Sequence, residues 1–240
     1  MTYGDMTRGA TTKADGAYLE MRNQILRGTL EPGSRVDYVQ LSASLGVSIT
    51  PLREALRRLE ADHLVIRNAH RDVVIAALTR EEASELVAVR QELDLLAARL
   101  AAVHMTKDEL DNARVLVASQ AEEQALRYLE DAGIPVAAGG LLSVNRAFHR
   151  MVYCGSHNQV LIQYRDAIST RTERYVILAS QLNTVPPGAY RLLHDKLLTA
   201  LEARDATAAE DLMQAHYREL DLNFADVIFG QPGESTTSGR

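Results

Sequence analysis

The sequence predicts a mainly α-helical protein, in which an N-terminal winged helix-turn-helix precedes an all-α bundle of six or seven helices. Three observations lead to this fold class. A glycine turn feeds a cationic helix near residue 50, two β-branched runs follow it, and the rest of the chain shows helical patterns without a strand signal. The expected domains are residues 13–78 and 79–228, flanked by flexible tails over residues 1–12 and 229–240.

The predicted helix-turn-helix is centred on a glycine. The run from Tyr38 to Leu45 has helical spacing, Gly46 suits a tight bend, and Ser48 or Thr50 can cap the helix that follows. Two short helices around such a turn are typical of a motif whose second helix enters the major groove of DNA. An ordinary helical hairpin in an all-α core is the alternative.

The β-branched runs extend this motif. Residues 64–67 and 73–76 are short apolar segments around a polar tip, which predicts a β-hairpin. With residues 16–27 as a first helix, the order becomes helix, helix, helix, hairpin, and this order is that of a winged helix-turn-helix.

Composition limits the possible functions. A single cysteine, Cys154, excludes an internal disulfide, and no stretch approaches the roughly 20 apolar residues of a membrane span. We expect a soluble, cytoplasmic protein with no membrane partner. The net charge is −6, but the first 78 residues carry 10 Lys and Arg against 9 Asp and Glu, whereas the remainder carries 16 against 23. A local basic cluster in the first part can therefore contact phosphates.

Six helices are predicted after residue 78. Thr79 to Glu82 and Thr106 to Glu109 are capping boxes, and Asp205 is a candidate cap for the last helix. The expected helices cover residues 79–103, 106–131, 141–154, 158–181, 188–203 and 206–227.

These helices carry a dispersed set of metal-ligand types. Asn145 and His149 are four residues apart and share one helix face, while His194 and His216 lie among apolar residues on the last two helices. Three imidazoles and an oxygen donor inside a bundle would hold a divalent ion. Taken singly, each histidine is more often a surface or hydrogen-bonded core residue than a metal ligand.

Both parts of the chain contain motifs that match known families. In the first part these motifs are residues 25–28, 30–33, Leu41, 45–48, 50–56 and Leu59. Through them the first part resembles the GntR family of bacterial transcription regulators. In the second part the motifs are residues 89–94, 97–102, 145–149, Asn158, His194, 197–198, 200–201, Asp205, Ala209 and His216. Through them the second part resembles the FCD ligand-binding domain of the FadR-like branch of that family.

The FCD resemblance implies a ligand site. It assigns the metal to Asn145, His149, His194 and His216, with zinc, nickel or manganese as candidate ions. Asn145 stands where an Asp is common, so this site should bind its ion more weakly. The resemblance also implies a small carboxylate effector. Its candidate contacts are Arg90, Tyr153 and Arg171. The alternatives are that Arg90 pairs with Asp94 and that Tyr153 is a plain core residue.

The GntR resemblance implies a DNA surface. Its candidate contacts are Ser48, Ile49, Thr50, Arg53 and Arg57 on the recognition helix and Asn68, His70 and Arg71 at the wing tip. Arg53 could instead form a salt bridge with Glu54 or Glu60. Family members very often carry Arg where this chain has Ile49, and isoleucine cannot hydrogen-bond a guanine edge. We therefore expect altered or weakened operator specificity, to which Asp72 would add an anion on the wing.

The leading interpretation is a homodimeric repressor that binds an inverted repeat in double-stranded DNA and responds to a small organic acid bound beside a divalent metal. One alternative is a metal sensor, in which the ion itself is the signal. A metal-dependent hydrolase is the third possibility. It is disfavoured because Asp195, next to His194, should point in a different direction, and we expect no enzymatic activity.

Overall fold

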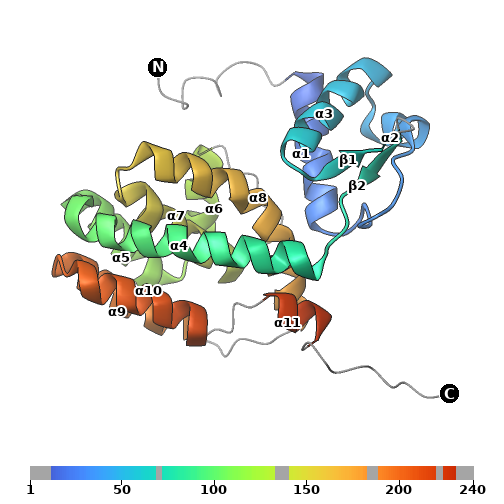
Figure 1. Cartoon of the computed structure of the whole chain (residues 1–240). Coiled ribbons are helices and arrows are strands. Elements are labelled where there is room, and N and C mark those ends of the chain that lie inside the picture. Colours follow the sequence, from blue (N-terminus) through green and yellow to red (C-terminus); the bar gives the residue numbers. More distant parts are fainter. Residues whose placement is uncertain (1–11, 69–71, 133–140, 183–188, 220–223, 231–240) are drawn as a thin grey trace. The chain divides into compact units, whose positions relative to one another are not determined.

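A computed structural model of the chain describes residues 12–68, 72–132, 141–182, 189–219 and 224–230 (Figure 1). Within these residues the chain forms helices and one two-stranded antiparallel sheet. In chain order the elements are α1 Lys13–Leu26, α2 Tyr38–Leu45, α3 Ile49–Ala61, β1 Val65–Arg67, β2 Val73–Ile75, α4 Arg80–His104, α5 Lys107–Ser119, α6 Glu122–Asp131, α7 Leu141–Gly155, α8 Gln159–Leu182, α9 Ala189–Glu202, α10 Ala206–Glu219 and α11 Phe224–Phe229. Among the described helices, none combines the length and the apolar character that crossing a membrane requires.

Helix α1 begins three residues earlier than predicted. Thr12 is its N-cap, and the Thr12 hydroxyl accepts a hydrogen bond from the Asp15 backbone N–H, while the Asp15 carboxylate accepts from the Thr12 N–H. This capping box supplies the start signal. Gly16, at which the predicted helix began, lies inside the first turn because a single glycine weakens a helix without ending it.

The turn of the helix-turn-helix follows the prediction in its backbone and differs from it in its cap. Gly46 has a φ of 64°, the left-handed conformation that glycine adopts without strain, and it ends α2. Ser48 occupies the N-cap position of α3, but its side chain makes no capping hydrogen bond, and Thr50 already lies within the helix. The predicted side-chain cap is therefore wrong.

The wing is a hairpin extended by an earlier segment. Val65 pairs with Ile75 and Arg67 with Val73, so the observed strands are one residue shorter than the predicted runs. The Val36 N–H donates to the Val73 carbonyl at 2.8 Å, which places the chain before α2 beside β2. Alternate side chains of the hairpin join α1 and α3 in one core. This core includes Met21, Ile25, Leu52, Leu56, Leu59, Leu64, Val65, Val73 and Ile75.

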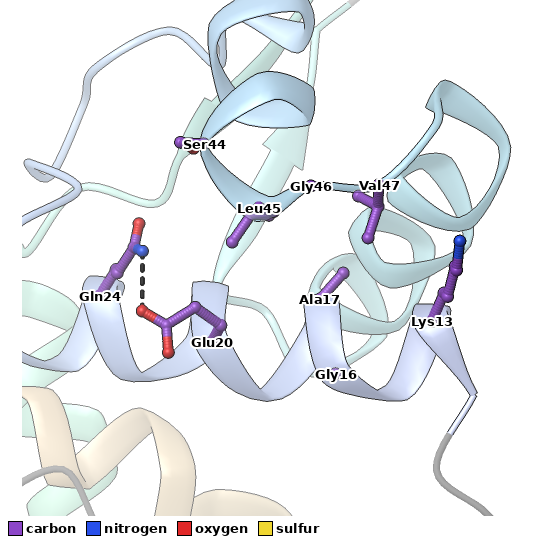
Figure 2. A pocket seen from close by; sticks show the side chains of 9 residues that line it. All are labelled: Lys13, Gly16, Ala17, Glu20, Gln24, Ser44, Leu45, Gly46 and Val47. Carbon is purple, nitrogen blue, oxygen red and sulfur yellow. Dashed lines mark hydrogen bonds between the residues drawn. The ribbon is translucent and has the colours of Figure 1, made fainter.

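A pocket of about 450 Å³ opens within the same winged unit. Figure 2 shows Lys13, Glu20 and Gln24 of α1 facing residues 44–47 at the end of α2. The Gln24 side chain donates to the Glu20 carboxylate at 2.8 Å. None of the predicted metal or effector residues lines this pocket, so it is distinct from the predicted ligand site.

Helix α4 is the central element of the helices that follow the wing. It packs against α8, α9, α10 and α11 (Figure 1). Its buried residues include five alanines, Ala83, Ala97, Ala98, Ala101 and Ala102. Small side chains let neighbouring helices approach closely, which explains how one helix can contact several others.

Two predicted helices each correspond to two described helices. The helix expected over residues 106–131 is α5 followed by α6, because Gln120 adopts a φ of 48° and the Ser119 hydroxyl accepts from the Ala121 N–H. The helix expected over residues 206–227 contains α10 and the short α11, and residues 220–223 between them lie outside the described part. The described part of this region thus has eight helices instead of six or seven.

Candidate DNA interface and metal centre

The recognition helix α3 separates an apolar face from a polar one. Leu52, Leu56 and Leu59 are fully buried, whereas Arg53 and Arg57 are exposed, as are Ser48, Ile49 and Thr50 at the start of the helix. Arg53 forms no ion pair within the described residues, so the alternative salt bridge with Glu54 or Glu60 is not observed. Glu60 instead lies 3.3 Å from Arg67. The cation needed for DNA contact is therefore available at Arg53.

A third arginine of this helix has a different environment. The Arg58 guanidinium lies 2.6 Å from the Asp15 carboxylate and 4.1 Å from the centroid of the Tyr18 ring. The Tyr18 hydroxyl in turn donates to Asp62 at 2.6 Å. Arg58 therefore joins the far half of α3 to α1, a positioning role that its place in the sequence did not reveal.

The structure describes one of the three predicted DNA contacts at the wing tip. The Asn68 N–H donates to the Asp72 carbonyl at 2.8 Å and closes the hairpin, while His70 and Arg71 lie outside the described residues. The Asp72 carboxylate is 2.6 Å from Arg35. This pairing offsets the anion that we expected Asp72 to add to the wing.

Three predicted metal ligands bring ring nitrogens together. His149, His194 and His216 each offer one nitrogen, and these atoms all lie within 4.8 Å of one another. All three side chains are buried, and the rings of His194 and His216 stack with centroids 5.2 Å apart. Ligand nitrogens around a tetrahedral zinc are about 3.3 Å apart. Small side-chain rotations would therefore suit the cluster to an ion.

The protonation of the cluster also suits a metal. Burial, followed by the charge of His216, lowers the pKa of His194 well below its ordinary value. Burial, followed by the charge of Arg90, lowers the pKa of His216 to about 4. Both imidazoles are consequently neutral at pH 7, which is the form that binds a cation.

The fourth predicted ligand has an unsatisfied oxygen. Asn145 is buried on α7, and its Oδ1 atom has no hydrogen-bond partner among the described residues. Leaving a buried acceptor unpaired costs about 1–3 kcal/mol. A bound cation would remove this cost, so the donor set fits a divalent ion.

A buried ionic cluster surrounds Asp94. The Arg165 Nε atom lies 2.6 Å from Asp94, the Tyr217 hydroxyl donates to Asp94 at 2.5 Å, and the Arg90 Nε atom lies 3.5 Å away. Burial alone would raise the pKa of Asp94, but the charges of Arg165 and Arg90 outweigh it and hold the pKa below its ordinary value. Arg90 thus forms the Asp94 pair that was one of its two predicted roles.

The other two predicted effector residues have protein partners. The Tyr153 hydroxyl donates to Asp166 at 2.5 Å, and its ring packs in an apolar cluster with Ala97 and Leu161. The Arg171 Nη2 atom lies 2.6 Å from Glu82 in the first turn of α4. These contacts give Tyr153 and Arg171 a packing role and an ion-pairing role respectively.

Glu82 has more partners than a capping box provides. Its backbone N–H is capped by the Thr79 hydroxyl, as predicted, but its carboxylate binds Arg171 and the Tyr175 hydroxyl instead of returning to Thr79. The Tyr175 hydroxyl also accepts from the Thr79 N–H at 3.1 Å. Helix α8 therefore holds the first turn of α4.

Sequence reasoning missed Arg165 and Tyr217, which complete the Asp94 cluster. A signal for Arg165 was present, because it shares one helix face with Leu161, Ile168 and Thr172, and a cation on an apolar face needs a buried partner. Tyr217 directly follows His216, and nothing in its spacing distinguishes it from a core tyrosine.

The chain has a winged helix-turn-helix that exposes a cation on its recognition helix, and a helical part follows it. This arrangement defines the class of DNA-binding transcription regulators. The family model of bacterial regulatory proteins of the gntR family matches residues 13–75, and that of the FCD domain matches residues 85–219, more than half of the chain. The chain belongs to the GntR family, in the FadR-like branch that carries an FCD domain. These matches confirm the resemblance and the prediction of a regulator that is not an enzyme.

Individual relatives agree with this assignment. The chain is 30% identical over 197 residues to the probable D-xylose utilization operon transcriptional repressor of Paenarthrobacter nicotinovorans, with 80% of each chain covered. It is 24% identical over 212 residues to the transcriptional repressor GlaR of Escherichia coli (strain K12), covering 85% of this chain and 92% of the relative. The solved structure of E. coli McbR/YncC has a TM-score of 0.63 at 22% identity, over 90% of this chain and 100% of that chain, and supports the fold.

Replacing Arg53 with alanine is expected to weaken binding of a selected DNA duplex by about 1–3 kcal/mol, because the exposed guanidinium can contact a base edge or a phosphate. Fluorescence anisotropy of labelled duplexes would measure this loss. Arg99→Ala is the matched control, since Arg99 is a surface arginine of α4 bound to Glu210. Equal affinities of the Arg53 variant and the wild type would contradict the assignment of α3 as the recognition helix.

Proposed function

We propose that this regulator is a repressor whose operator binding is controlled by a small organic acid bound beside a divalent metal ion. The observation that carries the proposal is the cluster of three buried ring nitrogens within 4.8 Å of one another. Two of the relatives described above are repressors by name, which favours repression over activation.

In this proposal His149, His194, His216 and Asn145 hold the ion. When bound, the ion supplies a positive charge that attracts a carboxylate. The unsatisfied Asn145 oxygen and the neutral state of the two stacked imidazoles support this role. Imidazole-rich ligation suits zinc, nickel and manganese alike.

The cationic groups near the histidines favour an anionic effector. The guanidinium groups of Arg90 and Arg165 both approach the Asp94 carboxylate. A carboxylate effector could accept hydrogen bonds from the Arg90 guanidinium in a bidentate way. The expected effector is therefore a small organic acid and not a neutral sugar or a cation.

The regulator would act in the cytoplasm. It would bind DNA as a homodimer, because an inverted repeat in double-stranded DNA presents two equivalent half-sites to two winged units. Effector binding controls this complex only if the acid has different affinities for the DNA-competent and DNA-incompetent states.

A metal-sensing regulator is the second candidate, and one observation favours it. Asn145 provides a neutral oxygen where a carboxylate would bind a cation more strongly, so the ion could exchange in response to its concentration.

One experiment separates these functions. Purified protein selects fragments of its source genome, and binding of an enriched fragment is then measured for chelator-treated protein, for protein with Zn²⁺, and for both with a panel of mono-, di- and tricarboxylates. Release of DNA by a carboxylate from the metal-loaded protein alone is the expected result. If Zn²⁺ alone weakens or strengthens DNA binding and no carboxylate changes it, the protein is a metal sensor instead. If neither addition changes DNA binding, the proposal is wrong.

A further inference from the structure

The recognition helix exposes an apolar side chain where contact with DNA bases is expected. Ile49 is the first residue of α3, and 37% of its surface is exposed. Leu45 and Val47 of the preceding segment are more covered and pack against the core of the winged unit. More than a third of Ile49 is therefore open to solvent at the start of the recognition helix.

Ile49 lies beside the polar residues of α3 that are expected to contact DNA bases. Ile49 and Arg53 are four residues apart and share one face of the helix. Thr50 and Arg53 are exposed beside it, and the N-terminal residues of a recognition helix are those that contact base edges in the major groove. When the helix enters the groove, Ile49 must meet some chemical group of the DNA.

The major groove has few apolar groups that an isoleucine can contact. Base edges there present hydrogen-bond donors and acceptors, and their distinctive apolar group is the C5 methyl of thymine. An isoleucine that faced a polar edge would bury the edge without replacing its hydrogen bonds to water, which costs free energy. An isoleucine that faced the methyl group would bury two apolar surfaces against each other.

We propose that Ile49 recognises the C5 methyl group of a thymine in each operator half-site and is a specificity-determining residue of this regulator. The proposal rests on DNA binding through α3. Val39 and Ile66 are also exposed apolar residues of the winged unit, but they lie at the start of α2 and on β1 and not at the start of the recognition helix.

The test removes one methyl group at a time. The full chain first selects its operator from a random-sequence duplex pool, and each thymine of that operator is then replaced singly by deoxyuridine, which lacks only the methyl. For the wild type we expect one thymine position per half-site at which this replacement weakens binding about four-fold, as for one buried methyl group. Ile49→Ala should bind the thymine and deoxyuridine duplexes equally, and Ile49→Val should retain most of the difference.

Control variants distinguish methyl recognition from a general loss of affinity. Arg57→Ala and Val39→Ala are expected to preserve the ratio of the two affinities, whatever they do to binding itself. The proposal is overturned if no thymine position is sensitive in the wild type, or if Ile49→Ala retains the full difference. Failure of the wild type to enrich any duplex would instead overturn DNA binding through α3, and this result precedes any methyl comparison.

Discussion

Replacement of Asp94 by alanine is expected to destabilise the protein by about 3–5 kcal/mol, the cost of removing one partner from a buried ion pair. The physical reason is the deep burial of the cluster, since Asp94 and Arg165 are 2% and 4% exposed. The variant leaves the Arg165 guanidinium and the Tyr217 hydroxyl in a site of low dielectric without the carboxylate that they bind. Urea unfolding followed by circular dichroism would measure the change in the free energy of unfolding.

The matched control for this experiment is Asp111→Ala. Asp111 also forms an (i, i+4) pair, with Lys107 at 2.6 Å, but both side chains are largely exposed. Its loss should have little effect on stability, because solvent screens an exposed ion pair. Similar losses for the two variants would contradict the view that the Asp94 cluster is desolvated. Asp94→Asn should fall between them, because an amide oxygen can still accept from Tyr217 but carries no charge.

The second large effect concerns the histidines. His194→Ala and His216→Ala are each expected to weaken Zn²⁺ binding by about 100-fold or more, since even partners outside the coordination shell contribute about 10–100-fold. Isothermal titration of chelator-treated protein gives the stoichiometry and the affinity. A thermal melt gives an independent reading, because an ion at 100 times its Kd should stabilise the wild type by about 2.7 kcal/mol.

His157→Ala is the control for these variants. His157 is half exposed and bonds to Glu109 at 3.0 Å, so its loss should leave one Zn²⁺ per chain bound with unchanged affinity. If the wild type binds no ion, or if the His194 and His216 variants retain its affinity, the proposed metal centre is wrong. A further variant, Asn145→Asp, should bind the ion more tightly because it adds a negative charge to the donor set.

Local signals predicted the parts of the fold that local chemistry decides. Gly46 marked the turn of the helix-turn-helix because a left-handed backbone is costly for other residues, and Thr106 marked the start of α5 through its capping box with Glu109. The break between α5 and α6 carried a weaker signal. Gln120 adopts its left-handed conformation without a glycine or a proline nearby, and the turn is formed by local hydrogen bonds, among them one from the Ala121 N–H to the Ser119 hydroxyl.

The ion-pair partners of several charged residues could not be predicted, because the partners are far apart in the sequence. Spacing offered Asp94 as a partner for Arg90, and that pair exists, but the stronger contact of Asp94 comes from Arg165, 71 residues away. Arg171 was assigned to an effector, yet it binds Glu82, which local reasoning had assigned to a capping box. Periodicity shows which face of a helix is buried but not which side chain from another helix meets it.

Helix α8 has contacts at two places along its length, with Arg165 on the Asp94 cluster and Arg171 and Tyr175 on the first turn of α4. Arg165 and Tyr175 are ten positions apart, which corresponds to about 15 Å along one continuous helix. One continuous helix therefore holds both the Asp94 cluster and Thr79, which lies four residues after β2 ends at Ile75. A displacement of α8 would change both sets of contacts together.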